Sequence, residues 1–548
     1  MDAHVARRRT CRAPVFLFVV LLVLLLPTGA ALAADGVPLY PPGVDAGYAW
    51  TSMENPDMSA TALTFELIGL DATPPYAKSQ TARVMFWNAA TGVNRPIGAE
   101  VPALPDAADQ RSPAVCTFKG DVYTVWQQWN DPVTATRDIW LWRGAPNGDT
   151  DAGFPMLLVS GPAGSNQYSP EIGVSKTPAG DHLVVAWADD RDTAGATTWI
   201  YMLDLSANTD GDANPNYLEP GYDPAYGGDR VDPTGDPLKG QFGPAVGAKG
   251  VFWFDLRGAS DADNADIYRA DLNAVAPIVS LFWTNPADYG TGFLRATGDG
   301  AAWLGPGIAG GPFEPWVRKV GGGSGITTIV SSPMSLDASG SRLAVTGGHG
   351  GNTSGDPDVY FYDPATRQNV PVCSVGADIW NKLKIQDTPA LSTADGGYRV
   401  VWADSRKFTN TAATDSTALA YELYVALVPT VSLRASRTTV KLGGSVTLTS
   451  KVTPRFGGSK LKFQKGTAHS WSHAWLLGGK QVWYTGWKTL KGKSLSGAST
   501  TSWTWTPGAK GTYWVRAWFS GGTKYADVGS RKVPHVANTS KVIKVIVK

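Results

Sequence analysis

Short apolar runs separated by polar turn residues are the dominant pattern of this chain. In the stretch 183–205, LVVAWADDRDTAGATTWIYMLDL, apolar runs at 183–187 and 199–203 flank a polar segment. Both runs are rich in β-branched and aromatic residues, and turn-forming residues separate them. The pattern predicts two antiparallel strands joined by a hairpin.

The same hairpin recurs along the chain. A tryptophan ends the first strand, a return strand mostly follows after 13 or 14 residues, and a proline-led run precedes the tryptophan by 9 to 17 residues. A fourth apolar run follows in places, as at 155–159 and 278–281. The anchors are Trp126, Trp187, Trp253 and Trp402, with Trp303 and Val345 less clear, and Trp50 as an earlier copy whose return strand would reach Met85.

These repeats predict the fold class. A four-stranded antiparallel unit cannot bury both of its faces alone, whereas radial stacking buries each unit against its neighbours. We therefore expect an all-β chain that begins with a β-propeller of about seven four-stranded blades. A β-sandwich array and a solenoid are the alternatives, but closely spaced strands with no helical pattern between them favour the propeller.

The turn of the hairpin resembles that of TolB-like propeller repeats, in which a V-W-x-D-x-R strand and turn leads to a D-I-Y strand. Asp189-Arg191, Asp255-Arg257 and Asp404-Arg406 match the turn, within a resemblance that covers roughly residues 110–427. The resemblance implies a propeller fold and no particular ligand. Since a guanidinium can hold a carboxylate with two parallel hydrogen bonds, we interpret each Asp-x-Arg pair as structural.

A second domain is expected after a linker at 428–430. About seven short strands follow in residues 431–548, as in an immunoglobulin-like β-sandwich. The passage 436–454, with the later strand GTYWVRA, resembles bacterial Ig-like surface domains. Eight tryptophans lie between Trp471 and Trp518, and we expect some in the core and others outside, where Trp and Lys together hold sugars or anionic polymers.

The N-terminal segment 1–33 has the features of a secretory signal peptide. Arginines at 7, 8, 9 and 12 precede an apolar run at 15–26 and a small-residue site, Ala31-Leu32-Ala33. No later apolar stretch is long enough to span a bilayer. We expect an exported protein, extracellular or at the cell surface, with the propeller at 34–427. Cys116 and Cys373 fall in distant repeats, so a bond between them is not expected.

Charge is divided unequally between the two expected domains. Residues 431–548 contain 20 Lys and Arg and one acid, whereas residues 34–430 contain 24 basic and 45 acidic residues. The split indicates different partners for the two halves. The basic half is expected to adhere to polyanions or to dock on the acidic propeller. No recognition helix or RNA motif supports specific nucleic-acid binding.

One acidic loop predicts a metal site. In the stretch 208–219, NTDGDANPNYLE, oxygen-bearing side chains alternate as in calcium loops, and calcium prefers six to eight oxygen ligands. The stretch resembles the loops of thrombospondin type-3 and dockerin-like repeats, except that Ala213 replaces the glycine of the sharp bend. The candidate calcium ligands are Asn208, Asp210, Asp212, Asn216 and Glu219.

These features predict a secreted or cell-surface, non-catalytic binding and adhesion protein. Its propeller would present ligand-binding loops, and its basic domain would tether it to a cell-envelope polymer, a glycan or a surface protein, as a monomer. The alternative is a secreted propeller glycosidase with an accessory carbohydrate-binding sandwich domain. Two carboxylates beside aromatic residues at the centre of the ring would favour that alternative.

Overall fold

The computed structural model describes residues 37–38 and most of 51–548. The undescribed ranges are 1–36, 39–50, 71–77, 89–93, 98–108, 130–135, 208–216, 218–221, 233–238, 258–264, 285–291, 306–313, 327–330, 349–356, 374–385, 405–421, 473–479 and 526–531, with further gaps of one to three residues. The expected signal segment therefore lies outside the described residues. Every named element of the structure is a β-strand.

Seven sheets follow one another along residues 51–428, and we call them blades 1 to 7. Each of the first six is a four-stranded antiparallel meander in chain order. Blades 1 to 3 consist of β2 (Thr51–Ser59), β3 (Ala62–Leu70), β4 (Lys78–Asn88), β5 (Asn94–Pro96); β6 (Asp109–Phe118), β7 (Asp121–Trp129), β8 (Arg137–Gly144), β9 (Met156–Val159); and β10 (Gln167–Thr177), β11 (Gly180–Asp189), β12 (Trp199–Asp204), β13 (Asp229–Arg230).

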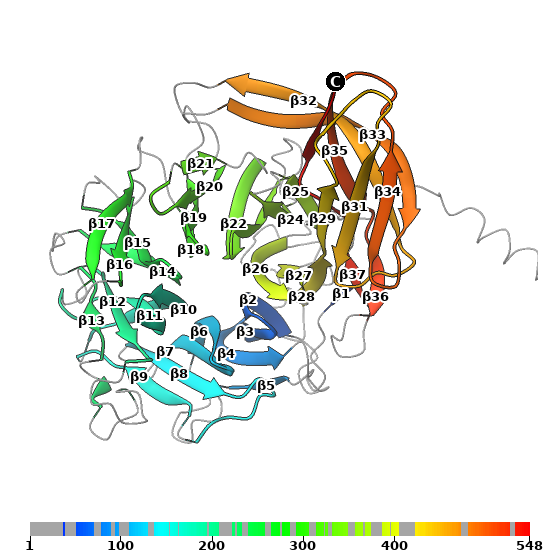
Figure 1. Cartoon of the computed structure of the whole chain (residues 1–548). Coiled ribbons are helices and arrows are strands. Elements are labelled where there is room, and N and C mark those ends of the chain that lie inside the picture. The colour runs from blue at the N-terminus through cyan, green and yellow to red at the C-terminus, as the bar shows by residue number, and fades with distance from the viewer. Residues whose placement is uncertain are drawn as a thin grey trace, which may run out of the picture. The chain divides into compact units, whose positions relative to one another are not determined.

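Blades 4 to 6 repeat this arrangement, and Figure 1 shows the blades in chain order around a common axis. They consist of β14 (Gln241–Gly247), β15 (Gly250–Asp255), β16 (Asp266–Asp271), β17 (Ile278–Trp283); β18 (Gly292–Ala296), β19 (Gly300–Gly305), β20 (Glu314–Lys319), β21 (Ser324–Ile326); and β22 (Ser331–Ser339), β23 (Arg342–Gly348), β24 (Pro357–Asp363), β25 (Gln368–Cys373).

Blade 7 closes the ring with strands from distant parts of the chain. Its own strands are β26 (Gln386–Ala394), β27 (Gly397–Asp404) and β28 (Glu422–Val428). The outer edge of β28 pairs antiparallel with β1 (Val37–Pro38) and, through Leu427 and His535, parallel with β37 (Lys532–His535). Such closure leaves the sheet no long open edge.

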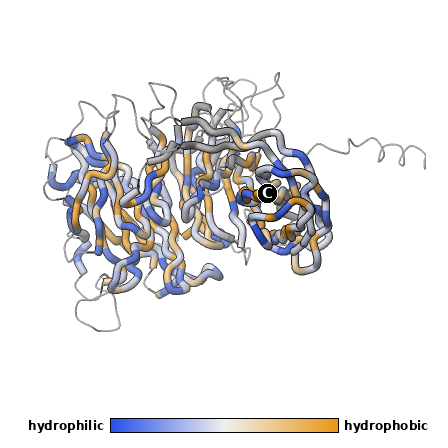
Figure 2. Tube along the Cα trace, turned by 45° about the horizontal axis from the view of Figure 1, so that its top comes forward, coloured by the Kyte–Doolittle hydropathy of each residue, from blue (hydrophilic) through white to orange (hydrophobic). Residues whose placement is uncertain are grey.

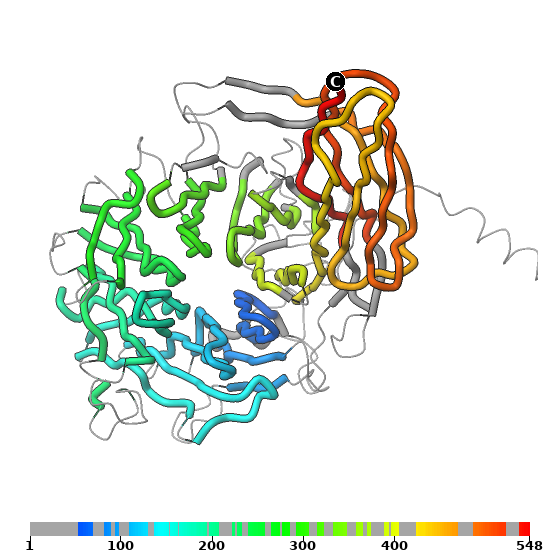
Figure 3. Tube along the Cα trace, in the orientation of Figure 1, coloured from blue at the N-terminus to red at the C-terminus, as the bar shows by residue number. Residues whose placement is uncertain are grey.

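The hydrophobic core lies between blades, as expected for radial stacking. Each of seven clusters of buried apolar side chains combines residues of two successive blades, and one cluster joins blade 7 to blade 1. Figure 2 shows hydrophobic and hydrophilic residues alternating along the strands, and Figure 3 traces the ring along the chain. The prediction of a propeller with about seven blades is confirmed.

The predicted anchors occupy equivalent positions. Trp126, Trp187, Trp253, Trp303 and Trp402 are fully buried, each opposite a β-bulge in the first strand of its blade. The prediction that Trp50 is the anchor of the first repeat needs correction. Trp50 lies outside the described residues, and Phe65, which pairs with Met85, takes the anchor position in blade 1 because β3 is a separate second strand.

The tail forms a two-sheet β-sandwich. One sheet contains β29 (Thr430–Ala435), β31 (Val446–Thr453) and β34 (Thr500–Trp505). The other contains β30 (Thr439–Val440), β39 (Ile543–Val547), β35 (Gly511–Phe519), β32 (Lys460–Ser472), β33 (Lys480–Ser494) and β38 (Asn538–Thr539). A shared core that includes Leu448, Phe463 and Phe519 lies between them. The remaining strand, β36 (Gly522–Tyr525), pairs with β37.

Cys116 and Cys373 are buried free thiols in β6 and β25. Burial raises the pKa of Cys116 to about 12, so this thiol is protonated and unreactive at neutral pH. Within the described part of the chain there is no helix with the length and apolar character of a membrane span.

Candidate active site

The first strand of each blade is interrupted by a bulge next to the propeller axis. At six of these bulges one residue has a left-handed backbone, and at five of those a proline follows directly. A bulge changes the direction of the side chains that follow it. Proline is tolerated there because its nitrogen does not have to donate a hydrogen bond to the neighbouring strand. The left-handed residues are Asn55, Ser112, Ser169, Gly243, Phe293 and Thr388.

The seven bulged strands line a cavity of about 350 Å³. Small-molecule sites are typically about 300–1,000 Å³, so the space suits one or two sugar-sized rings. The lining includes Asp57, Glu171 and Arg295, each the second residue after a left-handed position, together with Phe242 and Phe293.

Carboxylates from separate blades converge on one guanidinium in this cavity. Nη1 of Arg295 in β18 lies 3.3 Å from Oε1 of Glu171 in β10. Nε of the same guanidinium lies 3.4 Å from Oδ1 of Asp337 in β22. Because both nitrogens belong to one small planar group, the two carboxylate oxygens are no more than about 9 Å apart. Blades 3, 5 and 6 thus bring three charges together.

Asp57 and Asp337 also link neighbouring blades. Oδ2 of Asp57 accepts a hydrogen bond of 2.6 Å from the backbone N–H of Val115, in the first strand of blade 2. Oδ2 of Asp337 accepts an equivalent bond of 2.6 Å from Leu391, in the first strand of blade 7. Glu171 has no backbone hydrogen bond within the described residues, so its side chain is the least anchored of the three carboxylates.

The surroundings raise the pKa of every carboxylate in the cluster. Burial raises the pKa of Glu171 to about 8, partly offset by Arg295 and increased by the charges of Asp57 and Asp337. Burial likewise raises the pKa of Asp337 to about 7 and raises the pKa of Asp57, although Arg295 and backbone N–H groups oppose both shifts. The cluster therefore holds protonated and ionised carboxyls side by side near neutral pH.

Two aromatic residues border the charged cluster. Phe293 is 43% exposed and has φ of 49°, two residues before Arg295. Phe242 packs on Phe254, with ring centroids 5.3 Å apart. An apolar face beside paired carboxyls is the combination that recognises a sugar ring and acts on its glycosidic bond.

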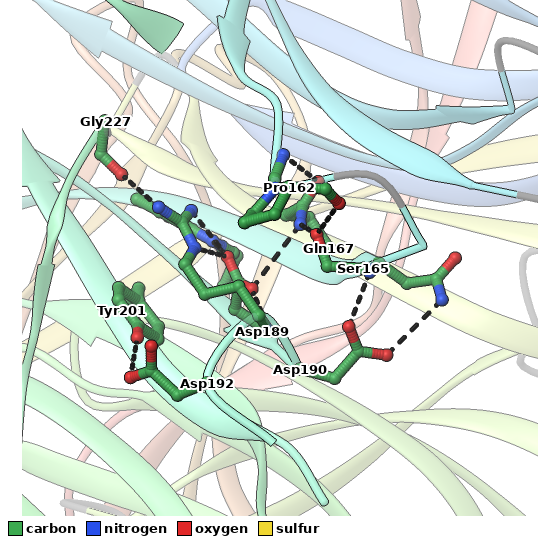
Figure 4. Close-up of polar contacts among 12 residues, drawn as sticks. Pro162, Ser165, Gln167, Asp189, Asp190, Asp192, Tyr201 and Gly227 are labelled. Carbon is green, nitrogen blue, oxygen red and sulfur yellow. Dashed lines mark hydrogen bonds and ion pairs between the residues drawn. The ribbon is translucent and has the colours of Figure 1, made fainter. Parts of the chain in front are cut away.

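Two of the predicted Asp-x-Arg turns, Asp189-Arg191 and Asp255-Arg257, are structural, as expected, whereas Arg406 of the third lies outside the described residues. In blade 3, Asp189 is fully buried and its carboxylate accepts bonds from Nε and Nη2 of Arg191 at 2.8 and 2.6 Å. The same carboxylate accepts a bond of 2.9 Å from Nε1 of the anchor Trp187. Figure 4 shows Asp189 at the centre of this network, with Gln167 on its other side. Blade 4 repeats the arrangement with Asp255, Arg257, Trp253 and Gln241.

The predicted calcium ligands are not described. Asn208, Asp210, Asp212, Asn216 and Glu219 all lie outside the described residues, and of that stretch only Tyr217 is seen, buried in the core. Among the residues that the structure describes, no cluster of three or more His, Cys, Asp or Glu is arranged to hold a metal ion. The calcium site stays a prediction.

The outer face of the tail sandwich carries alternating aromatic and basic side chains. On β35, Val515 and Ala517 face the core, whereas Trp514, Arg516 and Trp518 point away from it and are partly exposed. The guanidinium of Arg516 lies 3.9 Å from the ring centroid of Trp487. Nζ of Lys462 and of Lys544 lie 4.7 and 5.5 Å from the rings of Trp518 and Trp514.

Sequence reasoning did not identify the central carboxylates. Glu171 follows Pro170, a proline that was interpreted only as a strand start, and Asp57 follows Pro56, which was not assigned to the repeat. Asp337 and Arg295 have no motif around them. One sequence signal could have identified Asp57 and Glu171, namely an ionisable residue directly after the proline of the first strand. The first strands of blades 2, 4 and 7 have alanine there, at Ala114, Ala245 and Ala390.

No family model and no curated protein matches the sequence. Among solved structures, the chain is similar to an α-L-arabinanase of Penicillium chrysogenum bound to arabinobiose, with 12% identity, a TM-score of 0.35 and coverage of 72% of this chain and 97% of the other. It is similar to the GH93 α-L-arabinofuranosidase of Fusarium graminearum, with 10% identity, a TM-score of 0.34 and the same coverage. A Trypanosoma rangeli sialidase has 9% identity, a TM-score of 0.35 and 94% coverage of both chains.

These similar structures are glycoside-cleaving enzymes, which contradicts the prediction of a non-catalytic binding and adhesion protein. The physical reason for the error is that the catalytic candidates are single residues on separate blades, so no local sequence motif marks them. At such low identity and TM-score no substrate or residue role is transferred.

Proposed function

We propose that this protein is a glycoside hydrolase whose active site is the central cavity of the propeller. The observation that supports the proposal is the convergence of Glu171, Asp57 and Asp337 around Arg295, beside the exposed Phe293 and the half-buried Phe242. Glycoside hydrolysis commonly uses two carboxyl groups, about 5–10 Å apart, that take opposite protonation states. Glu171 and Asp57, which we assign as that pair, both line the cavity.

Glu171 is the proposed general acid. Its pKa of about 8 keeps it protonated at neutral pH, and it has the fewest hydrogen bonds holding it in the ionised form. It donates its proton to the glycosidic oxygen as the bond between that oxygen and the anomeric carbon breaks. The aglycone leaves as a neutral alcohol, and positive charge develops on the sugar ring.

Asp57 is the proposed base or nucleophile because it lines the cavity and its ionised form accepts the Val115 N–H. It takes a proton from the attacking water or attacks the anomeric carbon itself, and the configuration of the first product distinguishes the two routes. Asp337 is almost fully buried against Arg295, so we regard it as a positioning residue that orients the guanidinium and raises the pKa of Glu171.

The test is turnover of a panel of 4-nitrophenyl glycosides and polysaccharides. Glu171→Gln and Asp57→Asn should each lower kcat by about 10²–10⁴-fold, the usual contribution of acid–base catalysis. Asp337→Asn should lower kcat less and shift the pH profile. Asp299→Asn is the matched control, because Asp299 forms a surface ion pair with Lys319 in blade 5. Wild-type turnover by Glu171→Gln would refute the assignment.

We further propose that the tail is an accessory glycan-binding domain of Ig-like type. Trp514 and Trp518 are four residues apart on β35, with Arg516 between them on the same outer face, an arrangement suited to stacking against successive sugar units. A two-sheet sandwich with Greek-key-like strand order is compatible with the Ig-like resemblance. Export through residues 1–33 and the calcium site at 208–219 remain proposals based on sequence.

The tail proposal is tested on the full chain by affinity electrophoresis in gels that contain soluble polysaccharides. The double variant Trp514→Ala/Trp518→Ala should lose retardation while keeping its thermal unfolding temperature, since both side chains point out of the core. Lys451→Ala, an exposed change on the opposite sheet, is the control. Equal retardation of all three proteins would exclude this face.

A further inference from the structure

We propose that the central cavity selects an uncharged glycoside, one ring of which stacks on Phe293, and discriminates against sugars that carry a carboxylate. The inference rests on the proposed function for the bond that is cleaved, but its binding part can be tested without turnover. It follows from two independent observations, the charge of the cavity wall and the unusual residue at the bulge of blade 5.

The cavity wall has little capacity to bind an anion. Arg295 is the single cation among the lining residues that the structure describes. Its Nη1 contacts Glu171 and donates a hydrogen bond of 3.1 Å to the carbonyl oxygen of Leu294, and its Nε faces Asp337. A substrate carboxylate at this guanidinium would displace a protein carboxylate or lie beside three of them.

Such crowding of like charges is unfavourable in a poorly solvated site. Two carboxylates sharing a confined space repel each other, which is why one of them takes up a proton. An added uronic or sialic acid would increase that repulsion without bringing a cation. Hydroxyl groups, in contrast, both donate and accept hydrogen bonds and can pair with the existing carboxyls.

Phe293 differs from its equivalents in the other blades. The left-handed position holds Asn55, Ser112, Ser169, Gly243 and Thr388 elsewhere, all of them small or polar. A bulky side chain with positive φ is a genuine outlier, and strained residues of this kind concentrate at functional sites. Core packing does not explain it, because Phe293 remains 43% exposed and lines the cavity.

The position of Phe293 suits ring recognition. It lies two residues from Arg295, so a sugar on its face is next to the carboxylate cluster. The C–H face of a pyranose or furanose is apolar and packs on aromatic rings, while its rim of hydroxyls remains free for hydrogen bonds. Phe242 lines the cavity from the adjacent blade.

The test measures equilibrium binding to the full-length Glu171→Gln protein by calorimetry and saturation-transfer NMR. The probes are methyl glycosides of glucose, galactose, xylose and arabinose, and the matched acidic probes are methyl glucuronide and methyl N-acetylneuraminide. Glucose and glucuronic acid differ only at C6, so their ratio isolates the effect of the carboxylate. We expect each acidic probe to bind at least about 10-fold more weakly than its best uncharged counterpart.

Phe293→Ala should weaken binding of the uncharged probe about 10-fold or more, whereas Phe293→Tyr, which keeps the ring, should bind as the parent protein does. The control is Leu281→Ala, a large apolar residue that is 50% exposed on the outer strand of blade 4. Unchanged binding in Phe293→Ala, preferred binding of glucuronide, or no binding of any uncharged probe would overturn the inference. Failure of the proposed function looks different, since uncharged sugars would bind but the wild-type protein would cleave none of its panel.

Discussion

At the scale of single residues, the most informative side chain is Glu171. Its carboxyl is mostly buried, faces two other carboxyls and has one cationic partner, so its proton is retained at pH values where an ordinary glutamate is ionised. Of the residues that the repeat makes equivalent, Ala114, Ala245 and Ala390 are apolar, whereas Asp57 and Arg295 are charged. The fold itself therefore does not require an acid at this position, and the buried carboxyl of Glu171 lowers the stability of the folded state.

This cost predicts a pH-dependent effect of Glu171→Gln on stability. The pKa of Glu171 is raised in the folded protein from 4.5 to about 8, so the folded state binds the proton more tightly than the unfolded state does. Wild-type stability therefore falls as pH rises from about 4.5 to 8. Glu171→Gln removes this pH-dependent loss of stability. The free energy of unfolding of the variant, relative to wild type, should therefore be about 1–3 kcal/mol higher at pH 8 than at pH 4.

Thermal unfolding of the two proteins across pH 4–9 measures this difference. Asp299→Asn serves again as the control, because Asp299 lies in a surface ion pair. A constant difference between Glu171→Gln and wild type at every pH would show that the carboxyl is not perturbed.

At the scale of one structural element, the hairpins of blades 3 and 4 are fixed by the tryptophan, aspartate and arginine of their turns. In blade 3 the carboxylate of Asp189 receives the indole N–H of Trp187 and two guanidinium donors of Arg191. In blade 4, Nε2 of Gln241 donates to Asp255 while its Oε1 accepts the N–H of Ile200, so the network also joins successive blades. These contacts set the register of the hairpin and the position of the bulge opposite it.

Asp189→Asn should destabilise the fold by about 3–5 kcal/mol, because it leaves the nearly buried guanidinium of Arg191 without its carboxylate. Urea-induced unfolding measures the change. Asp192→Asn, in the same turn, is the comparison, since among the described residues the hydrogen bond that the Asp192 carboxylate accepts comes from the hydroxyl of Tyr201. If both variants lost the same stability, the special role of the Trp-x-Asp-x-Arg network would be disproved.

At the scale of the whole molecule, tail and propeller share strands and core. β37 pairs with β28, the backbone N–H of Val536 donates to the carbonyl oxygen of Leu427 at 2.9 Å, and Nδ2 of Asn538 donates to that of Pro429 at 2.6 Å. The side chain of Val536 is buried in the same cluster as Val372 and Val428 of blades 6 and 7. Blade 7 thus depends on residues from the tail.

Val536→Ala should therefore destabilise the propeller, although residue 536 belongs to the tail in sequence. Removing two buried methyl groups should cost about 1–3 kcal/mol through lost burial and a cavity. Calorimetry should show one transition in wild type and a lower unfolding temperature for that whole transition in the variant. Two separate transitions, with only the smaller one shifted, would mean that the tail folds independently of blade 7.

The strands, the repeat and the approximate number of blades could be predicted from the amino-acid sequence alone. These depend on local physics: alternation of apolar residues, turn chemistry, and the Trp-x-Asp-x-Arg contacts, which join residues within a few positions of one another. The sandwich character of the tail followed from the same kind of signal. The calcium loop and the signal segment remain predictions, because their residues lie outside the described part of the chain.

The grouping of the active-site candidates becomes apparent only in the folded chain. Asp57, Glu171, Arg295 and Asp337 are far apart in sequence and belong to four different blades, so no local motif relates them. Closure of the ring brings one bulge from each blade to the same axis, and the residues after those bulges then face one another. Their perturbed pKa values and the choice between binding and catalysis follow from that convergence, because burial and charge proximity arise only once the blades are assembled.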